Sequence, residues 1–312
     1  MKILCAGAYP ALQRSLHVGA WHAGAVNRIR AVGLTVAGKS VNTARALLRL
    51  GQDVVLTGFC GGSNGSLVRQ LLEAEGLTGL SFVETQADVR ICQTILPDGG
   101  GAFTELVEEG PALTDLEWDG LIGRCHDLLA EQAGLPVILS GTMPAHAPLD
   151  VYARVLEKRA SGPVVLDTSG PALLETIKRH PVYVKINGSE LFRSVGGDLA
   201  TDEAGLLAAA RVLLDAGARA VGITQGAGQA WLFTAAGVWR YRVPPVEVLS
   251  ALGSGDCVNA GFMVGLLAGE DLPNAFARGL ACGTANAESA SPAQFDADRV
   301  QFLLNRVQMQ QT

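Results

Sequence analysis

The stretch LGSGDCVNAGFMV, residues 252–264, places a glycine-rich turn and a carboxylate directly ahead of an apolar run of helical character. A turn that opens into a helix presents backbone N–H groups at the positive end of the helix dipole, which makes it an anion site. Asp256 adds a negative charge that a simple phosphate site would not need. The charge is explained if Asp256 removes a proton from an attacking hydroxyl while the backbone of residues 253–255 holds a phosphoryl group. The alternative is that Asp256 caps the helix.

A second glycine cluster, AGKSVN at residues 37–42, is also followed by a helical pattern. Counted back to Gly33, it satisfies the G-x-x-x-x-G-K-[ST] pattern of a P-loop, in which Lys39 would reach nucleotide phosphates. Residues 34–36 fill the required loop with apolar and β-branched side chains, which suit a strand better than a loop that wraps phosphates. A P-loop is therefore one interpretation of this stretch.

Two further clusters each permit two interpretations. In KINGSE, residues 185–190, Asn187 and Glu190 can point the same way on a first helical turn. They could hold the water shell of Mg²⁺, which takes few carboxylates, or they could form a capping box. TQGAGQ, residues 224–229, fits either a hairpin turn or a contact with nucleotide phosphates.

Short apolar runs rich in β-formers alternate with helical patterns along most of the chain. Strands are predicted at 54–57, 137–140, 164–167, 182–186 and 220–224. Helices are predicted at 41–50, 67–75, 149–159 and 204–216. Buried strands separated by helices indicate an α/β fold with a mostly parallel sheet covered on both faces. Several strands end in Ser, Asp, Asn or Thr, and ligands bind at the carboxyl ends of strands in such sheets.

Two segments, about 12–36 and 80–108, break this rhythm because they alternate like strands without helical periodicity. Within the second, residues 90–96 and 102–107 flank a glycine turn at 99–101 and predict a hairpin. A small β-sheet inserted into a single domain spanning 1–312 explains both segments. We also expect an N-terminal buried strand and, from residue 299 onward, a terminal helix.

Composition excludes several classes of protein. The 38 glycines make up about 12% of the 312 residues, against an average near 7%. With 48% hydrophobic and 17% charged residues, the chain is not a disordered protein. A net charge of −6 without a Lys or Arg run argues against nucleic-acid binding. Apolar runs are too short for a membrane span, and no signal-peptide core is present. Six cysteines without a CxxC motif suggest reduced thiols and a cytoplasmic location.

Taken in order, the motifs resemble the PfkB (ribokinase-like) family of carbohydrate kinases, most of all its 1-phosphofructokinase and tagatose-6-phosphate kinase branch. The motifs are G-K-x-x-N from Gly38, S-G-x-x-P from Ser140, K-x-N-x-x-E from Lys185, T-x-G from Thr224 and G-S-G-D from Gly253. The resemblance covers nearly the whole chain. It implies a ribokinase-like fold with a β-sheet lid, for which 12–36 and 80–108 are the candidates, and a homodimer formed through the lid. It also makes the P-loop match a coincidence, because G-K-x-x-N lines the sugar site in this family.

The resemblance implies ATP-dependent phosphoryl transfer to a hydroxyl of a sugar phosphate of the fructose 1-phosphate, fructose 6-phosphate or tagatose 6-phosphate type. Asp256 would be the general base, assisted by the backbone amides of Gly253, Ser254 and Gly255. ATP contacts would come from Lys185, Asn187, Thr224, Gly226, Gln229 and Asn286. Mg²⁺ would be held through water by Asn187 and Glu190, and a monovalent cation is a further expectation. Substrate contacts would come from Gln13, Gly38, Lys39, Asn42, Arg90 and Ser140.

A phosphate already present on the substrate would be recognised by Lys39 and Arg90, because the arginine fork suits a phosphate better than a neutral sugar. The sugar end departs from the family pattern at Gln13, where an aspartate is usual, and at Ser40 and His146, where glycines are usual. A kinase for an unphosphorylated sugar or a nucleoside, and a nucleotide-binding protein with a decayed sugar site, therefore stay as alternatives. Cys257 could be a packed small residue or a regulatory thiol.

Overall fold

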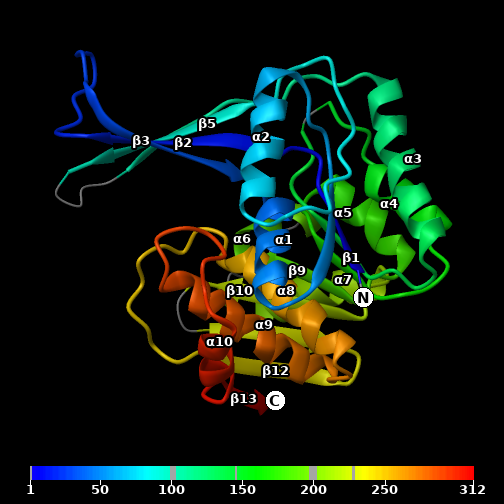
Figure 1. The fold of residues 1–312 in the computed structure, drawn as a ribbon. Coiled ribbons are helices and arrows are strands. Elements are labelled where there is room, and N and C mark those ends of the chain that lie inside the picture. The colour runs from blue at the N-terminus through cyan, green and yellow to red at the C-terminus, as the bar shows by residue number, and fades with distance from the viewer. Residues whose placement is uncertain (1, 99–102, 145, 197–201, 227–228) are drawn as a thin grey trace.

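A large and a small β-sheet organise the protein. The computed structural model describes residues 2–98, 103–144, 146–196, 202–226 and 229–312 (Figure 1). The large sheet has nine strands in the order β13-β12-β11-β10-β9-β8-β7-β1-β4. They are β1 (Lys2–Ala6), β4 (Asp53–Thr57), β7 (Val137–Ser140), β8 (Val164–Asp167), β9 (Tyr183–Asn187), β10 (Ala220–Gln225), β11 (Gln229–Thr234), β12 (Gly237–Arg242) and β13 (Gln308–Gln311). Pairing is parallel from β10 to β4 and antiparallel from β10 to β13, which confirms the predicted mostly parallel sheet.

Helices cover both faces of this sheet, because its buried strands are apolar on both sides. In β1, Ile3 and Cys5 belong to one core cluster while Leu4 and Ala6 belong to the other. One face is covered by α1 (Lys39–Arg49), α2 (Gly62–Ala74), α8 (Ser254–Leu267), α9 (Leu272–Ala287) and α10 (Ala297–Leu304). The other is covered by α3 (Asp115–Glu131), α4 (Val151–Val155), α5 (Pro171–Thr176), α6 (Gly188–Val195) and α7 (Glu203–Asp215).

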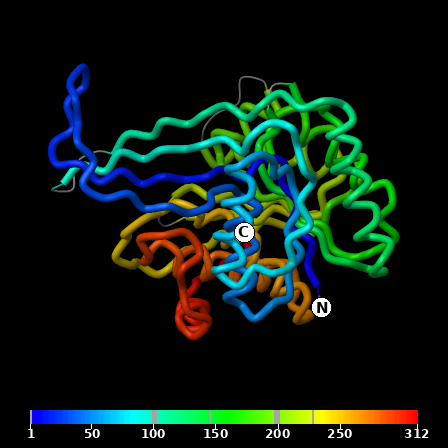
Figure 2. Tube along the Cα trace, turned by 45° about the horizontal axis from the view of Figure 1, so that its top comes forward, coloured from blue at the N-terminus to red at the C-terminus, as the bar shows by residue number. Residues whose placement is uncertain are grey.

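The small sheet has four strands in the order β3-β2-β5-β6. They are β2 (Ala11–Val18), β3 (Ile29–Ala37), β5 (Ile91–Pro97) and β6 (Thr104–Val107). The β2–β5 pairing is parallel and the other two are antiparallel. The sheet extends from the helical body as an arm, and Figure 2 shows the same arm from a second direction. The β5–β6 pairing confirms the predicted hairpin strands, whose glycine turn at 99–101 lies outside the described residues.

The two faces of the small sheet differ in polarity because side chains alternate along each strand. One face carries Arg14 and Gln93 among apolar side chains that include Val32, Leu34 and Leu106. The opposite face is mostly polar and carries Gln13, Ser15, His17, Thr35, Thr94 and Glu105. Both segments expected to break the α/β rhythm therefore form one sheet, and its action as a lid stays a prediction.

Residues 33–37 lie in strand β3 and pair with β2, so the stretch that matches the P-loop pattern is not a phosphate-binding loop. The prediction of a terminal helix from residue 299 was wrong for the last residues. Helix α10 ends at Leu304, and residues 308–311 form β13. This strand is a fully exposed QMQQ segment that pairs through its backbone with β12. Its sequence has no alternation of apolar and polar residues from which a strand could be predicted. Among the described helices, none is long and apolar enough to span a bilayer.

Candidate active site

Three of the predicted site residues, Ser140, Asn187 and Thr224, lie at the carboxyl edge of the parallel strands. Ser140 ends β7 and is in register with Asp167, which ends β8. Asn187 ends β9 and is in register with Thr224 near the end of β10. Polar side chains at this edge lie where open α/β sheets bind ligands. The first turns of α1 and α8 join them from one face of the sheet.

Asp256 is buried in the first turn of α8, three positions after Gly253, which begins the helix in a left-handed conformation with φ 78°. The Asp256 carboxylate accepts a hydrogen bond from Asn42 Nδ2 at 2.8 Å. Asn42 belongs to α1, so the contact joins two helices that are distant in sequence. The carboxylate thus faces the site and not its own helix terminus, and the interpretation of Asp256 as a mere cap was wrong.

A second buried carboxylate, Asp167, gathers three donors. Lys39 Nζ lies 2.8 Å from Asp167 Oδ1, while Asn259 Nδ2 donates to Oδ2 at 2.7 Å. Lys185 Nζ lies 3.4 Å from the same Oδ2. Lys39 stands at the start of α1 and also lies 3.7 Å from Glu190 Oε1. The lysine expected on the sugar side and the lysine expected on the ATP side therefore share one carboxylate.

These charges set the protonation of the two carboxylates in opposite directions. Burial and the negative charge of Asp167 raise the pKa of Asp256 to about 7, although Asn42, Lys185 and Lys39 act against the rise. Burial also opposes ionisation of Asp167, but the charges of Lys185 and Lys39 hold its pKa below the usual value. Burial likewise disfavours the charged form of Lys39, but Asp167 outweighs it and raises the lysine pKa. Asp167 is thus a fixed charge, and Asp256 can exchange a proton near neutral pH.

The glycines at 253 and 255 leave space for neighbouring groups at the start of α8. A Cβ on Gly255 would lie 2.5 Å from Lys185 Nζ, so the lysine ammonium lies against the bare backbone. A Cβ on Gly253 would lie 2.9 Å from Pro292 Cβ and 3.3 Å from Asn42 Nδ2. The backbone amides at the start of α8 and the Lys185 ammonium therefore share one small volume, which suits a phosphate group.

Asn187 and Glu190 form the capping box that the spacing allowed. Asn187 Oδ1 accepts from the Glu190 amide at 2.8 Å, and Glu190 Oε2 accepts from the Asn187 amide at 3.2 Å. Glu190 Oε1 is left facing Lys39. The capping interpretation is confirmed, and the magnesium role of the pair stays a prediction.

The residues predicted to bind sugar lie at the root of the small sheet and the start of α1. Gln13 Nε2 donates to Thr94 Oγ1 at 2.9 Å on the polar face. Arg90 precedes β5, and its buried Nε finds no acceptor among the described residues. Ser140 Oγ is likewise buried and unpaired within the part of the chain that the structure describes. Gly38 precedes α1 with φ 140°, a conformation that favours glycine.

Ser40, which replaces a usual glycine of the family pattern, lies against the turn that follows β1. A Cβ on Gly7 would lie 2.6 Å from Ser40 Oγ and 2.5 Å from the Ser140 carbonyl oxygen. A glycine thus accommodates the hydroxyl. His146, the second position where a glycine is usual, is exposed.

The remaining residues predicted to bind ATP lie along β10, β11 and α9. Gly226 follows β10 with φ 60°, and Gln229 begins β11 with an exposed side chain. Asn286 is buried behind the α8 terminus, where its Nδ2 donates to Leu252 O and Ser254 Oγ, both at 2.9 Å. Asn286 therefore fastens the glycine turn from behind, and its contact with ATP stays a prediction.

Comparison with known proteins settles the family. Residues 11–297 match the pfkB family carbohydrate kinases. A 1-phosphofructokinase of Bacillus subtilis (strain 168) is 30% identical over 282 residues, which cover 90% of this chain and 90% of that protein. This chain belongs to the pfkB family of carbohydrate kinases. It is accordingly an ATP-dependent carbohydrate kinase, as the order of its motifs predicted.

Solved structures confirm the ribokinase-like fold of this pfkB family kinase. Phosphofructokinase-2 from Escherichia coli in complex with potassium superposes with a TM-score of 0.90 and 22% identity, covering 98% of both chains. The same Escherichia coli protein in complex with fructose-6-phosphate gives a TM-score of 0.85, also at 22% identity and with 98% of both chains covered. At this identity the likeness establishes the fold.

Sequence reasoning about the kinase missed Asp167 and Asn259 as site residues. Asp167 appeared only as the last residue of a predicted strand, and that position was the available signal. Asn259 follows Asp256 by one helical turn on α8, but nothing in the motif marks it as the partner of Asp167. Cys257 is fully buried, and burial raises the pKa of its thiol, which supports the packed-residue interpretation.

Proposed function

We propose that this kinase transfers the γ-phosphoryl group of ATP to a hydroxyl of a ketose phosphate, with Asp256 as the general base. The observation that carries the proposal is the buried Asp256 carboxylate, held by Asn42 beside the glycine turn at the start of α8. Its pKa of about 7 suits a group that must accept a proton near neutral pH. The acceptor class is that of fructose 1-phosphate, fructose 6-phosphate and tagatose 6-phosphate.

In the proposed reaction, Asp256 accepts the hydroxyl proton as the hydroxyl oxygen bonds to the γ-phosphorus. The bond between that phosphorus and the bridging oxygen to the β-phosphate breaks, and ADP leaves with the electron pair. Phosphoryl transfer depends mainly on positioning and on stabilisation of the transferred charge. The amides of Gly253, Ser254 and Gly255 would supply this stabilisation from the helix terminus, together with the Lys185 ammonium.

The rest of the nucleotide would lie along the ends of β9 and β10. Asn187 and Thr224 are adjacent there, and Gly226 follows β10 in a left-handed conformation without a side chain of its own. Gln229 begins β11 and pairs with Gln225 at the end of β10. Asn286 would act on the nucleotide through the loop that it holds against Ser254.

Mg²⁺ fits the donors of this site through water. Among the residues described, no group of three or more His, Cys, Asp or Glu side chains forms an all-protein cage. Glu190 Oε1 is the carboxylate oxygen that its capping box leaves unused, and the Asn187 side chain lies beside it. Mg²⁺ commonly keeps several waters and binds few carboxylates together with substrate phosphates. When bound, it would neutralise charge on the ATP phosphates.

Recognition of a substrate phosphate would rest chiefly on Arg90. Its buried Nε has no acceptor among the described side chains and backbone, and a phosphate would satisfy this donor. Lys39 already neutralises Asp167, so we expect it to orient the substrate more than to bind its charge. Gln13, Gly38, Asn42 and Ser140 would complete the sugar site. The Bacillus subtilis relative is named a 1-phosphofructokinase, and the Escherichia coli structure holds fructose-6-phosphate, which supports this acceptor class.

The small sheet would serve as lid and dimer contact. Its polar face carries Gln13 at the proposed sugar site. Thr35, at the root of the same face, accepts a hydrogen bond from Arg45 of α1. Helix α2 contacts β2 and β3, and Val36 near the root of the apolar face is buried, as are Leu16, Val18 and Ile95 farther out. Val32, Leu34 and Leu106 are exposed farther out, as a contact surface for a second copy requires. A monovalent cation requirement is a further part of the proposal, suggested by the potassium complex of the Escherichia coli protein.

A substrate panel with MgATP and a coupled ADP assay tests the function. We expect ADP release with one or more of the three ketose phosphates and nearly complete loss of turnover in Asp256→Asn. Normal turnover in this variant would refute the mechanism. Release only with unphosphorylated sugars or nucleosides would assign the other acceptor class. Thermal stabilisation by MgATP without turnover on any acceptor would leave a nucleotide-binding protein.

A further inference from the structure

Arg45 lies in the buried part of α1, one turn after Asn42, and its guanidinium is surrounded by acceptors. It is 6% exposed, although arginine is rarely buried unless paired. Nε lies 2.5 Å from Glu75 Oε2, and Nη2 lies 2.7 Å from Glu75 Oε1, so the ion pair is bidentate. Nη1 donates to the Val36 carbonyl at 2.6 Å, and Nη2 lies 3.2 Å from Thr35 Oγ1. The guanidinium is therefore fixed by α2 and by strand β3 of the small sheet.

The remaining contact of the guanidinium reaches the catalytic end of the molecule. Nη1 of Arg45 lies 3.3 Å from Asn42 Oδ1, and Asn42 Nδ2 lies 2.8 Å from Asp256 Oδ2. A carboxamide has an acceptor end and a donor end, and both are matched here. Rotation of the amide by 180° would place its NH₂ group against a cation and its oxygen against a carboxylate. The guanidinium thus selects the orientation in which Asn42 donates to Asp256.

We infer that Arg45 is a positioning residue that acts through Asn42 on the catalytic carboxylate and joins its orientation to the root of the small sheet. The inference rests on the proposed role of Asp256 as the base. Arg45 takes no part in substrate or nucleotide contacts as proposed above. The effect of Arg45 on the reaction is transmitted by the Asn42 amide alone, so substitutions at Asn42 and Arg45 can distinguish this route from a general loss of structure.

The predicted consequence is a change in the pH dependence of turnover. Besides Asn42, the charged groups that act on Asp256 are Asp167 on β8, Lys185 on β9 and Lys39 on α1. None of these charged groups contacts Arg45. Among the groups that act on Asp256, an Arg45 substitution therefore alters only the hydrogen bond from Asn42. Loss of a donor to the ionised carboxylate disfavours the charged form and moves the acid limb of the profile to higher pH.

Arg45→Lys is the test variant, because a lysine keeps the charge for Glu75 but cannot bridge Glu75 and Asn42 with a planar fork. We expect kcat to fall by roughly tenfold or more, the acid limb to move to higher pH and KM for ATP to stay near wild type. Arg49→Lys is the matched control, because Arg49 lies one turn farther along α1, where its side chain is exposed and contacts Gln294; it should leave kcat, the pH profile and KM for ATP unchanged. A wild-type pH profile in Arg45→Lys would overturn the inference.

The double variant Asn42→Ala/Arg45→Lys separates positioning from a general loss of structure. If Arg45 acts through Asn42, the double variant matches Asn42→Ala in kcat and in pH profile. If the double variant instead shows the product of the two separate losses in kcat, Arg45 acts by another route and the inference is contradicted.

Should Arg45→Lys not fold, Glu75→Gln loosens the guanidinium from the α2 side and should shift the acid limb in the same direction by a smaller amount. An unshifted limb in a folded Glu75→Gln would count against the inference. Asp256→Asn is assayed in parallel. Activity in Asp256→Asn would refute the proposed base. If Asp256→Asn is inactive and the pH profile of Arg45→Lys is unshifted, only the positioning role of Arg45 is refuted.

Discussion

Lys39 and Asp167 form a 2.8 Å ion pair although they lie on different elements, α1 and β8. The Asp167 side chain is buried, whereas the Lys39 side chain is partly exposed. Asp167 also holds Lys185, and together the three groups carry a net charge of about +1 beside Asp256. The Asp256 and Glu190 carboxylates offset this excess, so ATP and a sugar phosphate would bring further negative charge to a site whose two lysines are already paired.

Turnover should fall on the acid side of neutrality. Asp256 accepts a proton only when it is ionised, and its pKa is raised to about 7 by burial and by Asp167. Protonation therefore removes the active form as the pH falls through about 7, and kcat/KM should decrease about tenfold per pH unit below it. A pH–rate profile at saturating Mg²⁺ measures this. An acid limb at the ordinary pKa of an aspartate would contradict the assignment.

Asp167→Asn should move that acid limb to lower pH. The substitution removes a negative charge that raises the pKa of Asp256, and it leaves Lys39 and Lys185 to favour the ionised base. It also leaves the two lysines without their shared carboxylate, so kcat and the melting temperature should both fall. A limb that moves to higher pH would show that Asp167 acts on the base in some other way.

Arg90→Ala should weaken binding of the sugar phosphate and leave ATP binding unchanged. The variant removes a cation whose buried Nε has no hydrogen-bond acceptor among the described residues. We expect KM for the ketose phosphate to rise by roughly tenfold or more, the usual cost of a charge-assisted hydrogen bond. Arg69→Ala is the control, because Arg69 lies on α2 and pairs with Glu84 away from the site. Equal increases in KM for ATP and sugar phosphate would contradict the assignment.

Gly255→Ala should impair nucleotide binding more than folding. The new Cβ would lie 2.5 Å from Lys185 Nζ, the far end of a flexible side chain, so the ammonium would be displaced. KM for ATP should rise while the melting temperature stays close to wild type. Gly123→Ala in α3 is the matched control, because nothing lies within 4 Å of its Cβ and alanine favours the helix. A wild-type KM for ATP in Gly255→Ala would contradict the proposed contact.

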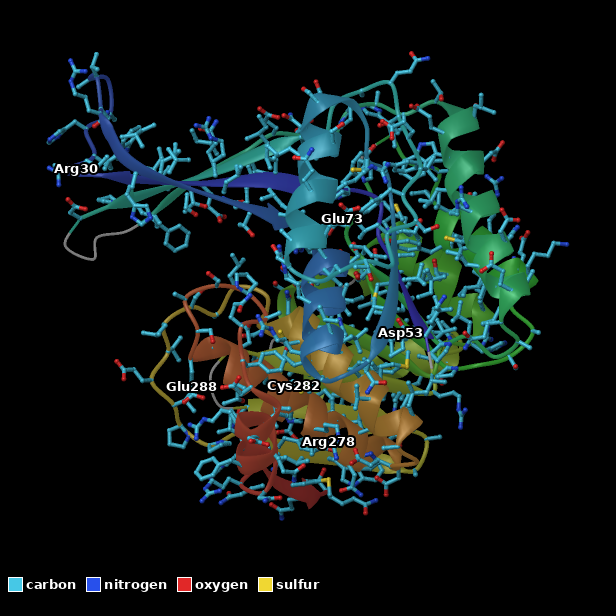
Figure 3. All side chains as sticks on the ribbon, viewed as in Figure 1. Arg30, Asp53, Glu73, Arg278, Cys282 and Glu288 are labelled. Carbon is cyan, nitrogen blue, oxygen red and sulfur yellow. The ribbon has the colours of Figure 1, made fainter. Side chains whose placement is uncertain are left out.

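Leu34→Lys should dissociate the proposed dimer. Leu34 is 41% exposed on the apolar face of the small sheet, where a charge would be buried in an interface between two copies. His17→Lys, on the opposite and polar face, is the control and should keep the wild-type mass. Light scattering at micromolar concentration distinguishes the two outcomes, and an unchanged mass in Leu34→Lys would contradict this interface. Figure 3 shows Arg30 near the outer end of this arm, away from the helices.

Local patterns predicted the parallel sheet well, because its strands are short buried runs with clear ends. The strands at 137–140 and 164–167 are found at the predicted residues. Strand β13 could not be foreseen, because its exposed QMQQ sequence gains its pairing from backbone groups alone.

The sequence predicted the motifs of the site one by one. It did not predict the contacts between them. Residue types at 38–42 and 253–256 indicate chemistry, but no local rule places the Asn42 amide on Asp256. The same holds for Asp167, whose partners come from α1, β9 and α8. These contacts depend on how helices dock on the sheet, which local sequence does not encode.

The Asn42–Asp256 contact also has a consequence for protein synthesis, because 214 residues separate its two members. The ribosome completes the sugar-side elements, through Ser140, long before it makes α8. A chain released before residue 253 lacks the proposed base and the proposed amide turn, whatever else it has folded. On the proposed mechanism, translation therefore adds the ability to hydrolyse or transfer the γ-phosphoryl group late, and truncated products of the message would consume none of the cell's ATP.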